Sequence, residues 1–90
     1  MFNKTGLNSV ESTKGFEVAR VGRLELKYTK GERSLIIDVE PGDGLAIYGS
    51  SIRSWGVGGM QSLLSEDEKA EIIKNVCDAL NFMNIEFVLI

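Results

Sequence analysis

The chain has 90 residues, of which 43% are hydrophobic and 26% are charged, with a net charge of −3 and no histidine. These proportions are typical of a soluble globular protein, and the length predicts a single domain over residues 1–90. No run approaches the roughly 18 apolar residues of a membrane span, and the first residues lack the apolar core of a signal peptide. A cytoplasmic protein is therefore expected, and the single cysteine excludes an internal disulfide.

The acidic residues are concentrated toward the C-terminal end. Residues 61–90 carry a net charge of −4, whereas residues 1–40 carry +1. An acidic surface repels phosphate backbones and attracts basic partners. The charge distribution therefore disfavours nucleic acid as a ligand.

Strands dominate the first half of the predicted fold. Residues 1–15 mix polar residues with glycine and predict an irregular N-terminal arm or a short edge strand, and residues 16–21 alternate weakly as a strand. Between residues 23 and 40, apolar and polar residues alternate on both sides of a Lys-Gly turn, which predicts an antiparallel hairpin. Pro41-Gly42 fits the centre of a type II turn, and residues 45–48 predict the next strand.

A helix and a last strand complete the predicted fold. The helix is expected to begin at Ser65, because Ser65 and Glu68 have the spacing of a capping box, and Asn84 suits a left-handed stop. Apolar residues at three- and four-residue spacings predict its buried face: Ile72, Ile73, Val76, Cys77, Leu80 and Met83. The apolar residues 85–90 predict a strand inside the sheet, with Phe87 under the helix. The order indicates an α+β fold, an antiparallel sheet of about four or five strands with one long C-terminal helix packed on one face and a final closing strand.

The chain offers little for catalysis. Histidine, the usual general acid–base residue, is absent, and Cys77 is expected in the core, where a thiol is inert. The segment Gly56-Val57-Gly58-Gly59 lacks the Lys-Ser/Thr that a phosphate loop requires. It is interpreted as a flexible loop, or as a loop that adapts to a partner. We therefore predict no enzyme activity, no cofactor and no metal site.

Two groups of carboxylates each have more than one interpretation. Glu66, Asp67 and Glu68 suit the positive end of a helix dipole, so capping explains them without a partner. Asp38 and Glu40 face the same side of one strand. They fit a solvated sheet face, a metal-ligand pair or an acidic patch that contacts a partner.

Trp55, the only tryptophan, also has two interpretations. A lone tryptophan in a small domain is more often a core residue. However, Trp55 is followed by small residues and lies near Arg53, and both residue types are enriched at interface hot spots. An exposed aromatic anchor is therefore the competing interpretation.

Four segments of the sequence combine into a family pattern. They read GERSLIIDVE at residues 31–40, LAIY at 45–48, SIRSW at 51–55, and LSEDEK from residue 64, continuing through the helix to Phe82. Together they resemble one of the small immunity protein families of bacterial polymorphic toxin systems, which include contact-dependent growth inhibition. The resemblance covers roughly residues 20–90 and implies an α+β fold with a characteristic tryptophan and acidic positions.

The resemblance implies that the protein neutralises a cognate toxin. Such a protein binds the toxic domain of an effector, often a nuclease, and blocks its active site or substrate groove. The expected toxin-binding residues are Trp55 as an anchor with Arg53, an acidic rim of Glu66, Asp67 and Glu71, and a second patch of Asp38 and Glu40. No membrane partner is expected, and a monomer is favoured. The alternative is a small non-enzymatic adaptor that binds a host protein by strand addition at an open sheet edge.

Overall fold

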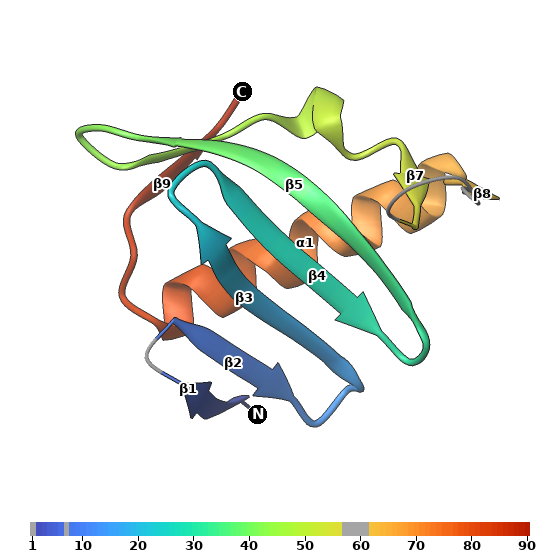
Figure 1. Cartoon of the computed structure of the whole chain (residues 1–90), viewed down its shortest axis with the longest axis horizontal. Coiled ribbons are helices and arrows are strands. Elements are labelled where there is room, and N and C mark those ends of the chain that lie inside the picture. Colours follow the sequence, from blue (N-terminus) through green and yellow to red (C-terminus); the bar gives the residue numbers. More distant parts are fainter. Residues whose placement is uncertain (1, 7, 57–61) are drawn as a thin grey trace.

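The computed structural model describes residues 2–6, 8–56 and 62–90, in which a curled sheet packs on one α-helix (Figure 1). The described elements are, in chain order, β1 (Phe2–Gly6), β2 (Ser9–Ser12), β3 (Phe16–Gly22), β4 (Glu25–Lys30), β5 (Arg33–Pro41), β6 (Leu45–Ile47), the 3₁₀ turn η1 (Gly49–Ser51), β7 (Ser54–Trp55), β8 (Ser62–Leu63), α1 (Glu66–Phe82) and β9 (Phe87–Leu89). The fold is α+β, as the order of predicted elements indicated.

The main sheet has seven strands in the described chain, in the order β1-β2-β3-β4-β5-β6-β9. Strands β1 to β6 form an antiparallel meander, and β9 pairs parallel to β6. The parallel pair follows from the connection, because α1 carries the chain across the sheet before β9 begins. Strands β7 and β8 form a separate two-stranded ladder. The prediction of four or five strands was therefore too low.

The additional strands come partly from the N-terminal segment, which is not an irregular arm but a hairpin whose first strand, β1, is an edge strand, as the alternative prediction had it. Strands β1 and β2 form a hairpin whose second strand pairs with β3, with Val10 opposite Val18. Both valines are fully buried. The ring of Phe2 packs against those of Phe16, at 5.7 Å between centroids, and Phe82, at 5.4 Å. Polar residues on the outward side of this hairpin obscured its alternation in the sequence.

The central hairpin of β4 and β5 agrees with the prediction. Leu26 lies opposite Ile37, and Tyr28 opposite Leu35, and all four side chains are buried. The predicted type II turn after β5 was wrong, because Pro41 still pairs with Leu45 and the positive φ falls on Gly44 instead.

Helix α1 begins as predicted. The Ser65 side chain accepts a hydrogen bond from the Glu68 N–H, and the Glu68 carboxylate accepts one from the Ser65 N–H, both at 3.1 Å. The helix buries Ile72, Val76, Ala79 and Leu80, whereas Ile73, Cys77 and Met83 are only half-buried. After the helix, Asn84 adopts the expected left-handed conformation, with φ of 58°.

One polar residue of α1 is buried with the apolar ones. Asn75 is not part of the apolar pattern that predicted the buried face of the helix, yet its side chain is buried. Its Nδ2 donates a hydrogen bond to the Tyr28 hydroxyl at 2.9 Å. Burial is therefore accompanied by hydrogen bonding, which is the condition under which a polar group enters a core.

The last strand was predicted inside the sheet, and this was wrong. β9 lies at the end of the strand order, next to β6 alone. Val88, Leu89 and Ile90 are exposed, and Phe87 is half-buried against the core. The apolar composition therefore belongs to an edge strand, not to an interior one.

Candidate functional site

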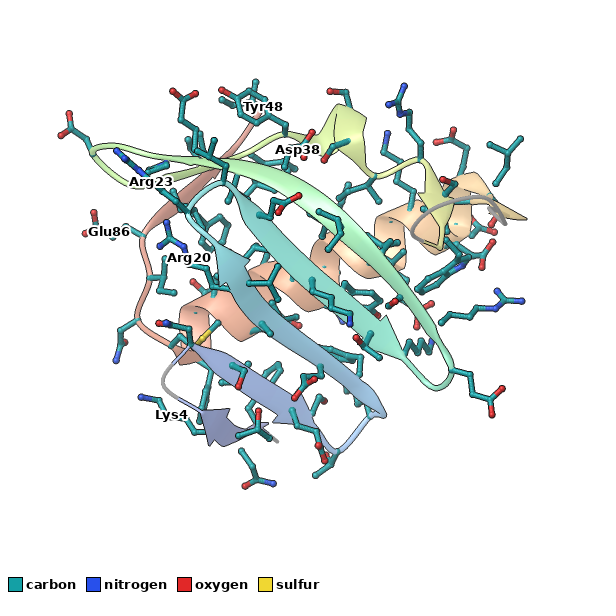
Figure 2. All side chains as sticks on the ribbon, viewed as in Figure 1. Lys4, Arg20, Arg23, Asp38, Tyr48 and Glu86 are labelled. Carbon is teal, nitrogen blue, oxygen red and sulfur yellow. The ribbon has the colours of Figure 1, made fainter. Side chains whose placement is uncertain are left out.

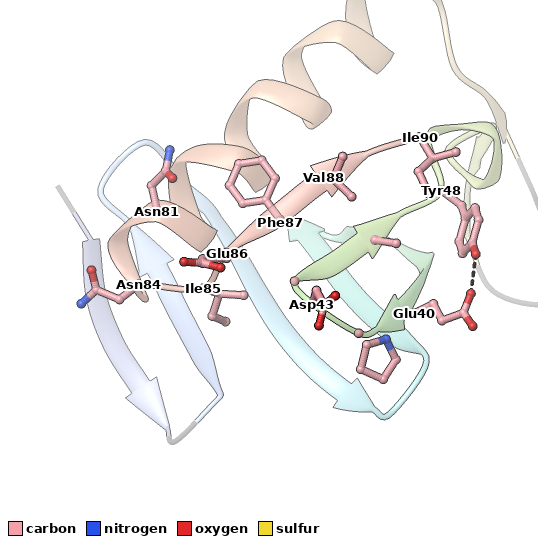
Figure 3. Close-up of a pocket in the computed structure, with 14 residues that line it drawn as sticks. Glu40, Asp43, Tyr48, Asn81, Asn84, Ile85, Glu86, Phe87, Val88 and Ile90 are labelled. Atoms are coloured by element: carbon pink, nitrogen blue, oxygen red, sulfur yellow. Dashed lines mark hydrogen bonds between the residues drawn. The ribbon is translucent and has the colours of Figure 1, made fainter.

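A shallow, open groove runs along β9 and the loop between β5 and β6 (Figure 3). We call it the edge groove and define it by three carboxylates, Glu40, Asp43 and Glu86, and three apolar residues, Ala46, Val88 and Ile90. The carboxylates come from the end of β5, the following loop and the residue before β9. The part of the chain that the structure describes contributes no lysine or arginine to its lining.

A tyrosine closes one end of the edge groove. The Tyr48 hydroxyl donates a hydrogen bond to Glu40 Oε2 at 2.5 Å (Figure 3). This carboxylate raises the pKa of Tyr48, first through the hydrogen bond and then through its charge. Tyr48 is therefore held as a neutral hydroxyl beside Glu40 at the rim of the groove.

Glycine suits the backbone conformation of the β5–β6 loop where it meets β9. The Leu45 N–H donates to the Glu86 carbonyl at 2.8 Å, and the preceding residue, Gly44, has φ of 149°. A Cβ at Gly44 would make an ordinary van der Waals contact, 3.5 Å from the Glu86 carbonyl oxygen, so glycine is favoured by the backbone conformation, which other residues rarely adopt.

The backbone of β9 has one bonded side and one open side. The Glu86 carbonyl accepts from Leu45, the Ile90 N–H donates to Ile47, and the Ile90 carbonyl accepts from Gly49. In a β-strand, the backbone N–H and C=O groups of alternate residues point toward the same neighbouring strand. The N–H and C=O groups of Phe87 and Leu89 consequently point away from β6, toward the open edge.

A second shallow groove, the face groove, lies on the uncovered side of the sheet beside η1. Asp38, Glu40 and Arg53 line it, together with Tyr48 and Ser51. Figure 2 shows Asp38 and Tyr48 close together at this end of the sheet. The structure thus brings three predicted binding residues to one surface, and Glu40 borders both grooves.

Trp55 lies in the core, so the interpretation as an exposed anchor was wrong. Only 6% of its surface is accessible, and its ring lies 5.9 Å from that of Tyr28. Its Nε1 donates to Glu68 Oε2 at 3.2 Å, and the Arg33 guanidinium lies 5.7 Å from the ring centroid. The neighbouring Gly56 is described, whereas the predicted adaptable loop at residues 57–59 lies outside the described residues.

The acidic residues of the helix form a separate surface. Glu66 and Asp67 are exposed in the first turn of α1. Glu71 is also exposed but pairs with Lys30, at 3.0 Å between Oε1 and Nζ. These three side chains line neither the edge groove nor the face groove. The predicted acidic rim therefore divides into a helix-start patch and one ion pair.

The remaining candidates for chemistry are the possible metal ligands and the single cysteine thiol. Within the described ranges, no three His, Cys, Asp or Glu side chains lie close enough to hold a metal ion. The Cys77 thiol is half-buried, and burial, followed by the nearby Asp78 charge, raises its pKa. The expectations of no enzyme activity, no cofactor and no metal stay predictions.

Sequence reasoning missed the residues that make the edge groove. Asp43 and Glu86 are far apart in the chain and were assigned no role, and Val88 and Ile90 were expected only as part of a strand inside the sheet. A signal was present in the connection, because a strand reached by a helical crossover pairs parallel to an earlier strand. Which edge it joins depends on packing that no local pattern encodes.

A scan of protein families, a search of curated proteins and a search of solved structures find no match for this chain. None of the described residues belongs to a helix with the length and apolar character needed to cross a bilayer. The edge groove and the face groove are therefore the structural basis for a functional proposal.

Proposed function

We propose that this chain is an immunity protein, which binds a cognate protein toxin and blocks its active site or substrate groove. The observation that carries the proposal is the edge groove, whose charged lining consists of the carboxylates of Glu40, Asp43 and Glu86 among the described residues. The sequence segments that resemble immunity proteins supply the class of partner. The groove supplies a surface suited to a basic protein.

The physical basis is charge complementarity followed by apolar contact. A nuclease toxin holds its substrate in a basic groove, because phosphates must be neutralised. Carboxylates at the edge groove attract such a surface and speed its capture. Exposed side chains of Val88 and Ile90 lie beside these carboxylates and provide apolar area that would be buried in the complex.

The burial of Trp55 changes which predicted residues support the proposal. Asp38, Glu40 and Arg53 keep their places at the surface, in the face groove that adjoins the edge groove. The helix-start residues Glu66 and Asp67 form a second acidic surface elsewhere. Binding through one surface can be distinguished from binding through the other, because neutralising the carboxylates of one surface leaves those of the other unchanged.

The test is whether this chain binds and inhibits the toxin domain that an immunity gene is expected to have encoded in its neighbourhood. The parent chain is expected to abolish the toxin's activity at equimolar ratio. Glu40→Gln, Asp43→Asn and Glu86→Gln combined should slow association by roughly tenfold at low salt and weaken its salt dependence. Glu66→Gln with Asp67→Asn is the matched control and should bind like the parent. No complex between the parent chain and the toxin domain would refute the immunity function.

A non-enzymatic adaptor is the second candidate, and one observation favours it. The open side of β9 offers unpaired backbone groups in the described chain, as strand addition requires. Genome context separates the two functions, because an immunity gene is expected beside a gene for a large toxin. An isolated gene, with no toxin gene in its neighbourhood, would favour the adaptor.

A further inference from the structure

We infer that the edge groove seats one long basic side chain, arginine or lysine, which projects from the partner protein. The apolar stem of that side chain would lie on the floor of the groove, and its charged end would meet the groove's carboxylates. The inference rests on the proposed function for the partner being a protein. It deepens that function by naming the chemical group that the groove recognises.

The edge groove is hollow because a small residue occupies its floor. Ala46 lies between Leu45 and Ile47 of β6, which are buried, so its methyl group faces the uncovered side of the sheet. In register, Ala46 pairs with Glu40 of β5 on one side and with Val88 of β9 on the other. A methyl group between two longer side chains therefore leaves a hollow, with a carboxylate on one wall and an apolar side chain on the other.

The carboxylates of the edge groove lie around this hollow. Figure 3 shows Glu40 beside Tyr48 at one end of the groove and Glu86 toward the other. The Tyr48 hydroxyl donates a hydrogen bond to Glu40, which holds that carboxylate in place. Both ion pairs within the described residues involve other carboxylates. Glu40, Asp43 and Glu86 are therefore left without a basic partner in the described chain.

Charge and apolar surface together select the occupant. Val88 and Ile90 are 56% and 65% exposed and line the same groove as the carboxylates. Lysine and arginine have an aliphatic stem and a cationic end, so a single side chain of either type matches both parts of the groove. An apolar side chain would leave the carboxylates unpaired. An acidic side chain, or the same groove of a second copy of this chain, would be repelled.

The first test uses the full chain and short capped peptides of glycine and serine with one variable residue at the centre. That residue is arginine, lysine or citrulline, which has the shape of arginine without its charge. In an NMR titration of the isotopically labelled chain, the arginine and lysine peptides should shift the methyl signals of Ala46 and Val88. The citrulline peptide should bind at least about threefold more weakly than the arginine peptide.

Variants of the chain separate the hollow from its charges. Ala46→Leu fills the hollow from the uncovered face and should weaken binding of the arginine peptide at least about fivefold. Ala19→Leu is the matched control, because Ala19 is half-buried like Ala46 and alternates with the buried Val18, yet does not line the groove. It should bind like the parent. Asp43→Asn with Glu86→Gln keeps the hollow and should reduce the preference for arginine over citrulline.

The same variants apply to the complex with the toxin domain, after thermal melts have shown that they fold. Ala46→Leu should weaken toxin binding at least about fivefold, whereas Ala19→Leu should not. A toxin variant in which the docking arginine or lysine is replaced by alanine should no longer respond to Ala46→Leu. This double-mutant cycle identifies the basic side chain that occupies the groove.

The outcomes distinguish this inference from the proposed function. Equal binding of the arginine and citrulline peptides, or an absence of shifts in the edge groove, would overturn the inference. Unchanged affinity of a folded Ala46→Leu chain for the toxin domain would also overturn it while leaving the immunity function intact. Failure of the parent chain to bind the toxin would refute the immunity function, and the peptide titration would still decide whether the groove takes a basic side chain.

Discussion

Tyr28 connects the aromatic part of the core to the helix. It is fully buried, with its ring 5.6 Å from that of Phe16 and 5.9 Å from that of Trp55. Its hydroxyl accepts the hydrogen bond from Asn75, and burial raises the pKa of Tyr28. The pair is therefore a neutral polar contact inside an apolar core, and its removal has a defined cost.

Tyr28→Phe should lower the free energy of unfolding by about 1–3 kcal/mol, because it leaves the buried Asn75 amide without its acceptor. The double variant Tyr28→Phe with Asn75→Leu should regain part of that loss, since both polar groups are then gone. Urea unfolding measures the stabilities of the parent, of Tyr28→Phe and Asn75→Leu alone, and of the double variant. A double variant less stable than the sum of the two single losses would contradict this account.

Glu68 joins the helix cap to the buried indole. The backbone hydrogen bond from Ser65 is the main cause of its lowered pKa, and the Trp55 Nε1–H adds to the effect. A carboxylate whose pKa is lower in the folded state stabilises the fold above its ordinary pKa of about 4.5. That contribution is lost as the pH falls through the lowered folded value.

Glu68→Gln should therefore reduce the melting temperature at pH 7, and the difference from the parent should shrink progressively below pH 4.5. Glu66→Gln is the control, since Glu66 lies in the same helical turn without the indole contact. Thermal melts followed by circular dichroism between pH 7 and pH 2 provide the measurement. A constant difference across that range would mean that the Glu68 charge contributes nothing.

At the scale of elements, the sequence predicted correctly those elements for which a single local pattern was sufficient. The alternation in residues 23–40 and the capping box at Ser65 each predicted an element that the structure contains. The N-terminal hairpin and the position of β9 could not be predicted in this way. Their polar or uniformly apolar residues fit more than one environment, and only pairing with β3 and β6 decides between them.

The candidate site was less predictable than the fold for a related reason. Asp38, Glu40 and Arg53 were identified correctly as surface residues, but Asp43 and Glu86 become neighbours only through the parallel pairing of β9. Trp55 had few apolar neighbours in the sequence. Its buried environment comes from Tyr28 and Glu68, which lie on other elements.

Leu80→Ala tests the packing of α1 on the sheet. Leu80 is fully buried, and removing such a side chain costs about 2–5 kcal/mol, including the cavity that remains. In a small domain with roughly 5 kcal/mol of stability, this change would approach complete unfolding. Lys74→Ala, on the exposed face of the same helix, should change stability by less than about 0.5 kcal/mol. If Leu80→Ala changed stability as little as Lys74→Ala, the buried face assigned to α1 would be wrong.

At the scale of the whole molecule, one core connects most of the elements. Buried apolar side chains form a single cluster that extends from Val10 in β2 through Trp55 to Leu80 in α1. A chain with one continuous core is expected to unfold in a single step. The hairpin at one edge and the helix start at the other end should therefore lose structure together.

Trp55 makes this expectation measurable, because it is the only tryptophan and reports on the β7 end of the core. Urea unfolding followed by Trp55 fluorescence and by far-ultraviolet circular dichroism should give coincident midpoints. Deleting residues 2–6 should shift both midpoints downward by the same amount. Separate transitions would show that the β7 region and the rest of the sheet are independent units.

The mixed direction of the sheet also sets an order for folding. Strands β1 to β6 join neighbours in sequence through short connections, whereas β9 meets β6 only after the whole helix intervenes. Closing a long loop costs entropy that local hairpins do not incur. The meander is therefore expected to form before β9 docks, so that β6, already paired with β5, is the edge strand of the sheet until the last step of folding. Because β9 is a three-residue strand at the edge of the sheet, it is also expected to be less protected in hydrogen exchange than the interior strands.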